Sequence, residues 1–126
     1  MSEERTRTHG EDEIRARLAR DLPHWTYDGA FLCRRYRTGG WRATTMAFGA
    51  VAHLAELAWH HPDVEASYGS LTVKLQTHDA GGITDLDFAL AARIEDVVAW
   101  SPGEGPLPGL PDGDAHAYVL GEGDGR

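Results

Sequence analysis

Three histidines lie close together in one stretch of the chain, between Glu56 and Asp87. His60 and His61 are adjacent, and His78 follows a segment with the pattern of a β-hairpin, so folding can return it to the first two. Imidazole titrates near neutral pH and is the side chain best suited to take and give protons there. Three imidazoles brought together indicate acid–base chemistry.

The spacing of these residues predicts the elements that carry them. Glu56 and His60 are four residues apart, which places them on the same face of a helix. Pro62 disfavours a helical conformation in the residue before it, so this helix is predicted to end at His61. The histidine pair then lies at a helix C-terminus, where the dipole favours the imidazolium form. His78 ends a run of alternating apolar and polar residues and falls on the polar face of that strand.

Each residue also has a purely structural explanation. His60 and His61 can simply cap a helix C-terminus, and Glu56 can be a solvated helix residue. Asp87 can be the fourth member of a capping box opened by Thr84. A three-histidine zinc site is a rival chemistry, because zinc binds imidazole readily. Adjacent side chains tend to point apart, however, and the chain has no HExxH or CxxC motif, so no metal is expected.

The same stretch resembles the motif of a known family, the pterin-4a-carbinolamine dehydratases. That motif is an acidic residue, three others, His-His-Pro, an aromatic-containing hairpin, Thr-His, a Gly-Leu/Ile-Thr/Ser turn, and an aspartate before a helix. The matching residues are Glu56, His60-His61-Pro62, Tyr68, Thr77-His78, Gly82-Ile83-Thr84 and Asp87. The resemblance covers residues 22–98.

The resemblance implies a hydro-lyase, a 4a-hydroxytetrahydrobiopterin dehydratase, which forms quinonoid dihydropterin during tetrahydropterin recycling. It implies that His60 and His78 are the acid–base pair and that His61, the third catalytic histidine, mainly binds and orients the pterin. Glu56 would tune the adjacent imidazoles, and Asp87 would orient His78 or the hairpin. The family uses no metal, and the resemblance implies no cofactor beyond the pterin substrate.

The resemblance also implies substrate contacts and partners. Trp25, Pro62 and Thr77 are the implied substrate-binding residues, although the spacing of Trp25 by itself favours burial in the core. Trp59 stands where the family usually has a polar residue, which predicts a place near a subunit contact or the pocket rim. The implied partners are the pterin, further copies of the chain in a homodimer or homotetramer, and an aromatic amino-acid hydroxylase.

A second class of function stays open. Members of this fold also act as binding proteins without catalysis, as dimerisation cofactors of a transcription factor or as a dehydratase-like assembly factor for Rubisco. The complete set of Glu56, His60, His61, His78 and Asp87 favours the enzyme over a scaffold that has lost its chemistry.

The composition excludes several other classes. A chain of 126 residues with 41% apolar and 25% charged residues is typical of one soluble globular domain. Its net charge of −8 argues against general affinity for nucleic acid or an anionic membrane. The single cysteine, Cys33, is predicted to be a buried structural thiol. One cysteine permits no internal disulfide, so a reducing cytoplasm is the expected location. The N-terminus lacks the apolar run of a signal peptide, and no stretch approaches the length of a membrane span.

The pattern helix–strand–strand–helix–strand–strand–helix predicts an α+β fold, with three helices on one face of a four-stranded antiparallel sheet. Helices are expected over residues 11–22, 41–61 and 85–100, and strands over residues 24–28, 30–36, 64–68 and 71–78. Residues 1–10 are expected to be disordered, residues 11–100 to form the domain, and residues 101–126 to be a Gly/Pro/acidic tail. Within this tail, residues 115–120 have the composition to add a short strand.

The longest predicted helix carries a row of mostly apolar residues at alternating steps of three and four, which is typical of a face packed on a sheet or on a partner. Its members are Trp41, Thr45, Phe48, Ala52, Ala55 and Trp59.

Overall fold

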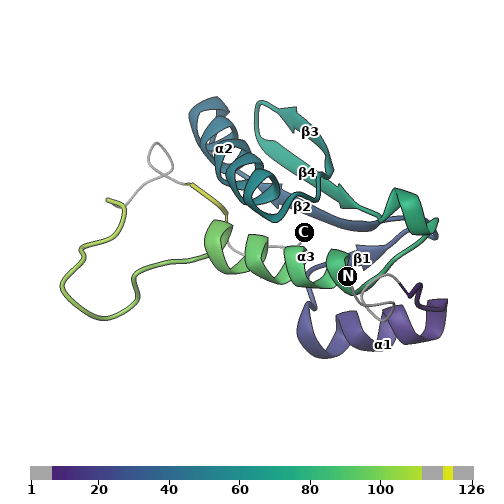
Figure 1. The fold of residues 1–126 in the computed structure, drawn as a ribbon. Helices are drawn as coiled ribbons and strands as arrows, with labels where there is room; N and C mark the ends of the chain where they lie inside the picture. Colours follow the sequence, from purple (N-terminus) through teal and green to yellow (C-terminus); the bar gives the residue numbers. More distant parts are fainter. Residues whose placement is uncertain (1–6, 112–117, 121–126) are drawn as a thin grey trace.

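The computed structural model describes residues 7–111 and 118–120, and it confirms the predicted α+β class and element order (Figure 1). The elements are α1 (Glu11–Asp21), β1 (Thr26–Tyr27), β2 (Leu32–Arg37), α2 (Trp41–Ala58), β3 (Asp63–Ser67), β4 (Ser70–Leu75), the 3-10 turn η2 (His78–Ala80) and α3 (Asp85–Val98). The four strands form one antiparallel sheet in the order β1-β2-β4-β3. Helices lie on one face of this sheet.

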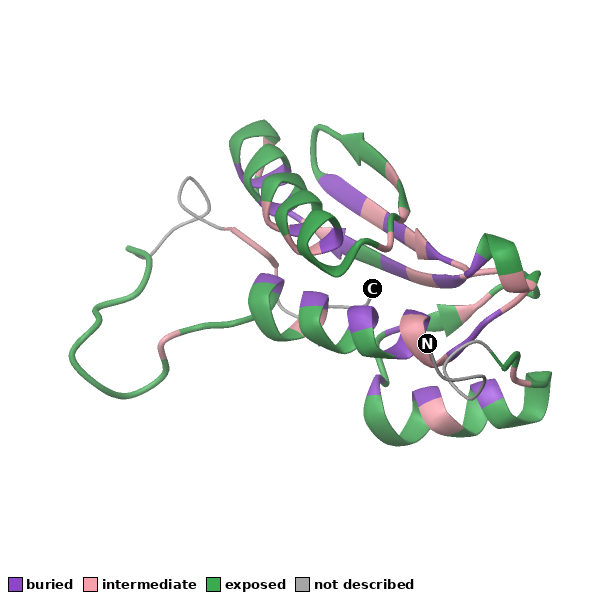
Figure 2. Cartoon of the chain, viewed as in Figure 1, coloured by how far each residue is buried: buried purple, intermediate pink, exposed green. Residues whose placement is uncertain are grey.

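The two central strands alternate between a buried and a more exposed face, as their sequences predict (Figure 2). The side chains that point toward the helices are Leu32, Arg34, Tyr36, Leu71, Val73 and Leu75. Cys33 lies on the other face and is half-buried rather than buried. Burial, together with the Asp28 carboxylate, raises the pKa of this thiol to about 11, so it stays protonated at neutral pH.

The buried face of α2 differs from the predicted row. The buried residues are Ala43, Thr44, Ala47, Val51 and Ala55, and only the last of these belongs to the expected face. Trp41 and Phe48 are 52% and 43% exposed. Small side chains occupy the buried stripe because α2 approaches β3, β4 and α3 closely, and large rings lie on its flank. Neither α2 nor another helix within the described ranges is long and apolar enough to cross a lipid bilayer.

A half-buried carboxylate, that of Glu95, joins α3 to the sheet. Glu95 Oε1 accepts hydrogen bonds from Arg34 Nε (2.9 Å), Tyr36 OH (2.8 Å) and Trp25 Nε1 (2.9 Å). Glu95 Oε2 accepts a fourth from Arg34 Nη2 (3.0 Å). Trp25 is therefore a core residue, as its spacing favoured. The backbone N–H of Trp25 bonds to the carbonyl oxygen of Leu22, which leaves β1 shorter than the predicted strand over residues 24–28.

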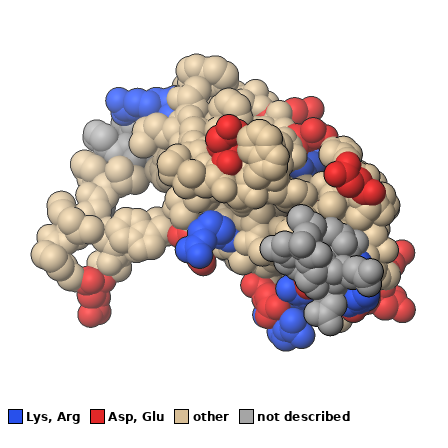
Figure 3. All heavy atoms as spheres, in the orientation of Figure 1, with Lys and Arg blue, Asp and Glu red and all other residues tan. Residues whose placement is uncertain are grey.

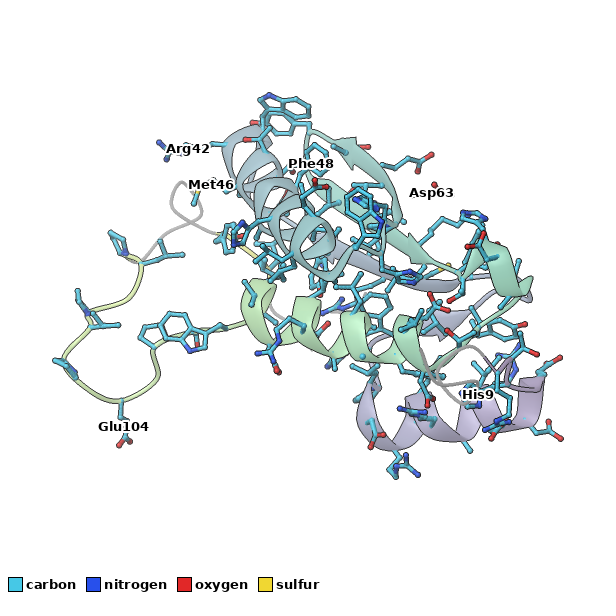
Figure 4. All side chains as sticks on the ribbon, viewed as in Figure 1. His9, Arg42, Met46, Phe48, Asp63 and Glu104 are labelled. Carbon is cyan, nitrogen blue, oxygen red and sulfur yellow. The ribbon has the colours of Figure 1, made fainter. Side chains whose placement is uncertain are left out.

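The segment before α1 packs on the beginning of α3, whereas the sequence predicted disorder through residue 10. The backbone N–H of His9 donates to the carbonyl oxygen of Ile83 (2.9 Å). Its ring nitrogens lie 2.9 Å from Asp85 Oδ1 and 3.0 Å from Glu13 Oε1, and the His9 side chain is only 4% exposed. Figure 4 shows His9 beside α1 and α3. Residues 1–6 lie outside the described residues.

Replacing His9 by alanine is expected to lower the free energy of unfolding by about 1–3 kcal/mol, because Asp85 and Glu13 lose a buried partner. Denaturant unfolding followed by circular dichroism measures the change. The matched control is His53→Ala, since His53 is an exposed histidine on α2. Equal stability of the two variants would contradict the structural role of His9.

The described end of the tail returns to the sheet. Val119 forms an antiparallel bridge with Thr38, and the N–H of Leu120 donates to the carbonyl oxygen of Arg37 (2.8 Å). Of the strand predicted over residues 115–120, only residues 118–120 are described, and they form this one bridge. Residues 112–117 and 121–126 lie outside the described residues.

A cavity of about 1280 Å³ lies between the beginning of α2 and the tail. Figure 4 shows Arg42 and Met46, which line it, projecting from α2 on the side of the tail. The histidines of the motif lie at the opposite end of this 18-residue helix.

Candidate functional site

The end of α2 places the first two histidines. The helix ends at Ala58, three residues before the predicted end at His61. Trp59 adopts the left-handed conformation (φ 53°), and the N–H groups of Trp59 and His60 bond to carbonyl oxygens of the last turn at 3.3 and 3.1 Å. This pair of bonds is a Schellman turn, which ends a helix and reverses the chain. Pro62 restricts only the residue before it, so it does not determine where the helix ends.

His60 is held by a buried carboxylate. Its Nε2 lies 2.6 Å from Asp87 Oδ1, and the two side chains are 15% and 0% exposed. Asp87 Oδ2 accepts hydrogen bonds from Thr77 Oγ1 (2.8 Å) and from the backbone N–H of Thr84 (2.9 Å). A carboxylate accepts hydrogen bonds, so Nε2 carries the hydrogen and Nδ1 of His60 presents its lone pair. The arrangement suits a proton acceptor in a fixed orientation.

Asp87 makes two structural interactions: it caps the beginning of α3, and it bonds to His60. Thr84 is the N-cap of α3, and Asp87 is the third helical residue, so the capping box proposed from the sequence is confirmed. Asp87 was predicted to orient His78 or the hairpin, and its carboxylate bonds to His60 rather than to the His78 imidazole. Through Thr77 it also holds the chain just before His78. The first turn of α3 therefore ties the end of α2 to the end of β4.

His61 has a different environment from His60. Its Nε2 lies 2.9 Å from Glu56 Oε1, and both side chains are more than half exposed. The Trp59 ring lies 5.0 Å from the His61 ring at an interplanar angle of 84°. The predicted pairing of Glu56 with His60 on one helix face is wrong, because His60 lies beyond the helix end. Glu56 instead holds His61.

His78 begins the turn η2 and is exposed. Thr77 and Gly82 form an antiparallel bridge around this turn, and Gly81 has a φ of 75°, which favours glycine. Among the described residues no hydrogen bond holds the His78 side chain. Its neighbour Thr77 contacts Asp87, which in turn contacts His60, so the three histidines of the motif belong to one end of the fold.

The predicted substrate-binding residues are not all brought to this end. Trp25 is 3% exposed and bonds to Glu95, about two turns further along α3 than Asp87, so it lies in the core apart from the histidines. Thr77 is 7% exposed, and its hydroxyl is engaged by Asp87, which makes it a support for His60. Pro62 is half-buried directly after His61.

Two features of the site had little support in the sequence. The hydroxyl of Thr84 lies 2.8 Å from that of Thr77 and completes the network around Asp87; the capping-box spacing was the sequence feature that pointed to it. The left-handed Trp59 had no such indication, because glycine and asparagine are the usual residues there. Within the described residues, no group of three or more His, Cys, Asp or Glu side chains could hold a metal ion.

Charged side chains do not concentrate at one place on the visible surface. Figure 3 shows acidic and basic side chains interspersed around α1 in the lower part of the view, and large uncharged areas elsewhere. The local charges at the histidines come from Glu56 and Asp87.

Known proteins are similar to this chain in sequence and fold. Residues 7–97 match the family model described as Pterin 4 alpha carbinolamine dehydratase. The chain is 40% identical over 88 residues to a protein of Aquifex aeolicus, covering 70% of this chain and 88% of that protein. It is 42% identical over 94 residues to a protein of Streptomyces avermitilis, covering 74% and 89%. Both relatives carry a provisional name as pterin-4-alpha-carbinolamine dehydratases.

A solved structure agrees with these relatives. The crystal structure of a transcriptional coactivator/pterin dehydratase from Brucella melitensis superimposes with a TM-score of 0.64 at 26% identity. The match covers 71% of this chain and 96% of that one. From the family model, the relatives and the fold together, the chain belongs to the pterin 4 alpha carbinolamine dehydratase family.

Proposed function

We propose that the protein dehydrates 4a-hydroxytetrahydropterin to quinonoid dihydropterin. In this reaction the bond from C4a to the hydroxyl oxygen breaks, the hydroxyl leaves as water after gaining a proton, and a ring nitrogen loses a proton. The reaction therefore needs one proton acceptor and one proton donor near the bound pterin. The observation that carries the proposal is the hydrogen bond of His60 to the buried carboxylate of Asp87.

His60 is the proposed proton acceptor. The bond from Nε2 to Asp87 orients the ring and leaves the lone pair of Nδ1 for the substrate. Asp87 also stabilises the imidazolium that forms when Nδ1 takes a proton, because it is an acceptor already aimed at the ring. The base is therefore the histidine whose partner is buried.

His78 is the proposed proton donor to the departing hydroxyl, and His61 the residue that orients the pterin. His78 is exposed on a turn, where it can exchange protons with water between turnovers. Glu56 holds the His61 ring through Nε2, so this imidazole offers a fixed edge to a polar ligand. We further infer that the protein acts on a tetrahydropterin recycled by an aromatic amino-acid hydroxylase, as a cytoplasmic homodimer or homotetramer.

A stopped-flow assay of 4a-hydroxytetrahydropterin decay tests the function. The wild-type protein is expected to accelerate the decay, and His78→Ala is expected to lose most of the acceleration while keeping its circular dichroism spectrum. The matched control is the exposed His53→Ala, which should retain the wild-type rate.

A binding role without catalysis is the second candidate. It is favoured by the solved structure from Brucella melitensis, whose title joins a transcriptional coactivator to a pterin dehydratase. A folded wild-type protein that leaves the decay rate unchanged would overturn the dehydratase assignment in favour of this candidate.

A further inference from the structure

Trp59 has a backbone conformation that its side chain does not favour. It is the only non-glycine residue in the described ranges with a positive φ, 53°. A bulky residue is an outlier in the left-handed region, and asparagine or glycine forms the same Schellman turn with less strain. The end of α2 therefore gains nothing from an indole at this position. Strain of this kind persists at functional sites, where another requirement selects the side chain.

The indole of Trp59 is exposed and oriented. Trp59 is 75% exposed, although tryptophan has one of the largest apolar side chains. The edge-to-face contact with His61, at 5.0 Å and 84°, fixes the ring beside that imidazole. His61 is itself held by Glu56, so the two rings form a supported right-angled corner directly before the chain reaches Pro62.

This corner matches the chemistry of a flat heterocycle. A pterin has two apolar faces and a rim of hydrogen-bonding nitrogen and oxygen atoms. A site for it needs a flat apolar wall beside a few placed polar groups, which is the usual composition of a small-molecule site. Trp59 supplies an aromatic surface, and the His61 imidazole against it supplies a polar ring.

We propose that Trp59 is a substrate-positioning residue whose indole stacks on the bicyclic ring of the pterin; the inference rests on the proposed function. The histidines then act on the rim of a ring whose plane is set by the indole. The strained conformation at Trp59 is retained because it brings the indole out of the helix end and beside His61.

The test compares Trp59→Asn and Trp59→Phe with the wild type. Binding of 7,8-dihydrobiopterin, which lacks the 4a-hydroxyl, is measured by isothermal titration calorimetry, so the readout does not depend on turnover. Trp59→Asn is expected to weaken binding by about 5- to 100-fold, the range found for loss of a stacked aromatic ring. Its melting temperature is expected to equal or exceed that of the wild type, because asparagine tolerates the left-handed conformation. Trp59→Phe should restore most of the binding.

The matched control is Trp100→Asn, which replaces another exposed tryptophan, 61% exposed, beyond the end of α3. It should bind 7,8-dihydrobiopterin as the wild type does. If the wild type binds and Trp59→Asn binds equally well, the stacking role is overturned while the proposed function stands. Unchanged binding with an altered mass in sedimentation would overturn it in favour of a subunit contact. A wild type that binds no dihydrobiopterin overturns the proposed function and this inference together.

Discussion

Turnover of 4a-hydroxytetrahydropterin is expected to fall by about 10²–10⁴-fold when His60 is replaced by glutamine, the usual effect of losing a positioned acid or base. Glutamine keeps an N–H donor at the end of its side chain, so the buried carboxylate of Asp87 keeps a partner. It offers no basic nitrogen in place of Nδ1. The loss is therefore expected in kcat, with the fold preserved. Stopped-flow kinetics together with thermal unfolding measure both effects.

The control for His60→Gln is His53→Gln, which makes the same change at an exposed site on α2. The control should match the wild type in rate and in melting temperature. A His60→Gln protein with the wild-type rate would remove His60 from the mechanism. A large drop in melting temperature, with a loss of rate that stabilising conditions reverse, would assign the residue a structural role only.

The second large effect is a loss of stability when Glu95 is replaced. Replacing Glu95 by alanine should lower the free energy of unfolding by about 3–5 kcal/mol, the usual cost of removing one partner of a buried ion pair. The guanidinium of Arg34 is 2% exposed and would lose the ion pair with Glu95. The Tyr36 hydroxyl and the Trp25 indole would lose the same acceptor. Denaturant titration measures the difference, and the adjacent exposed residue provides the control Asp96→Ala.

Because the pKa of Glu95 is shifted in the folded protein, the free energy of unfolding is expected to depend on pH. Burial raises the pKa of Glu95, but hydrogen bonds from Arg34 and Tyr36 and the charge of Arg34 outweigh it, and the pKa lies below its ordinary value of 4.5. A lowered pKa in the folded state stabilises the protein above the unfolded-state pKa, and this stabilisation is lost as the pH falls through the folded-state pKa. Glu95→Gln should therefore lose less stability than the wild type below pH 4.5. Parallel acid profiles of the two proteins would contradict this role.

Much of the fold follows from local patterns in the sequence. The alternation along β2 and β4 determines which side chains face the helices, because successive residues of a strand point to opposite faces. The spacing of Thr84 and Asp87 determines where α3 begins, because the capping box is a local hydrogen-bond pattern. The three histidines and their flanking residues were also sufficient to identify the family, since separated pieces of the motif recur at the right spacing.

Other features were decided by contacts between elements that are distant in the sequence. The space between α2, the sheet and α3 admits only small side chains, so Ala47 and Val51 are buried and Phe48 lies on the flank, although hydrophobicity alone favours the larger ring. The partner of Asp87 is His60 because the first turn of α3 packs beside the end of α2. No local pattern specifies that pairing.

The left-handed turn at Trp59 shows which features follow from the sequence and which depend on the tertiary structure. From the sequence, Pro62 predicted only that a helix ends in this region, at His61. The residue at which it ends is Ala58, and only the structure shows that His60 is held by Asp87 from the distant α3 while His61 is held by the nearby Glu56. The sequence thus determines which types of residue are available for chemistry. Their partners are decided by packing, because a hydrogen bond forms only where the fold brings donor and acceptor within reach.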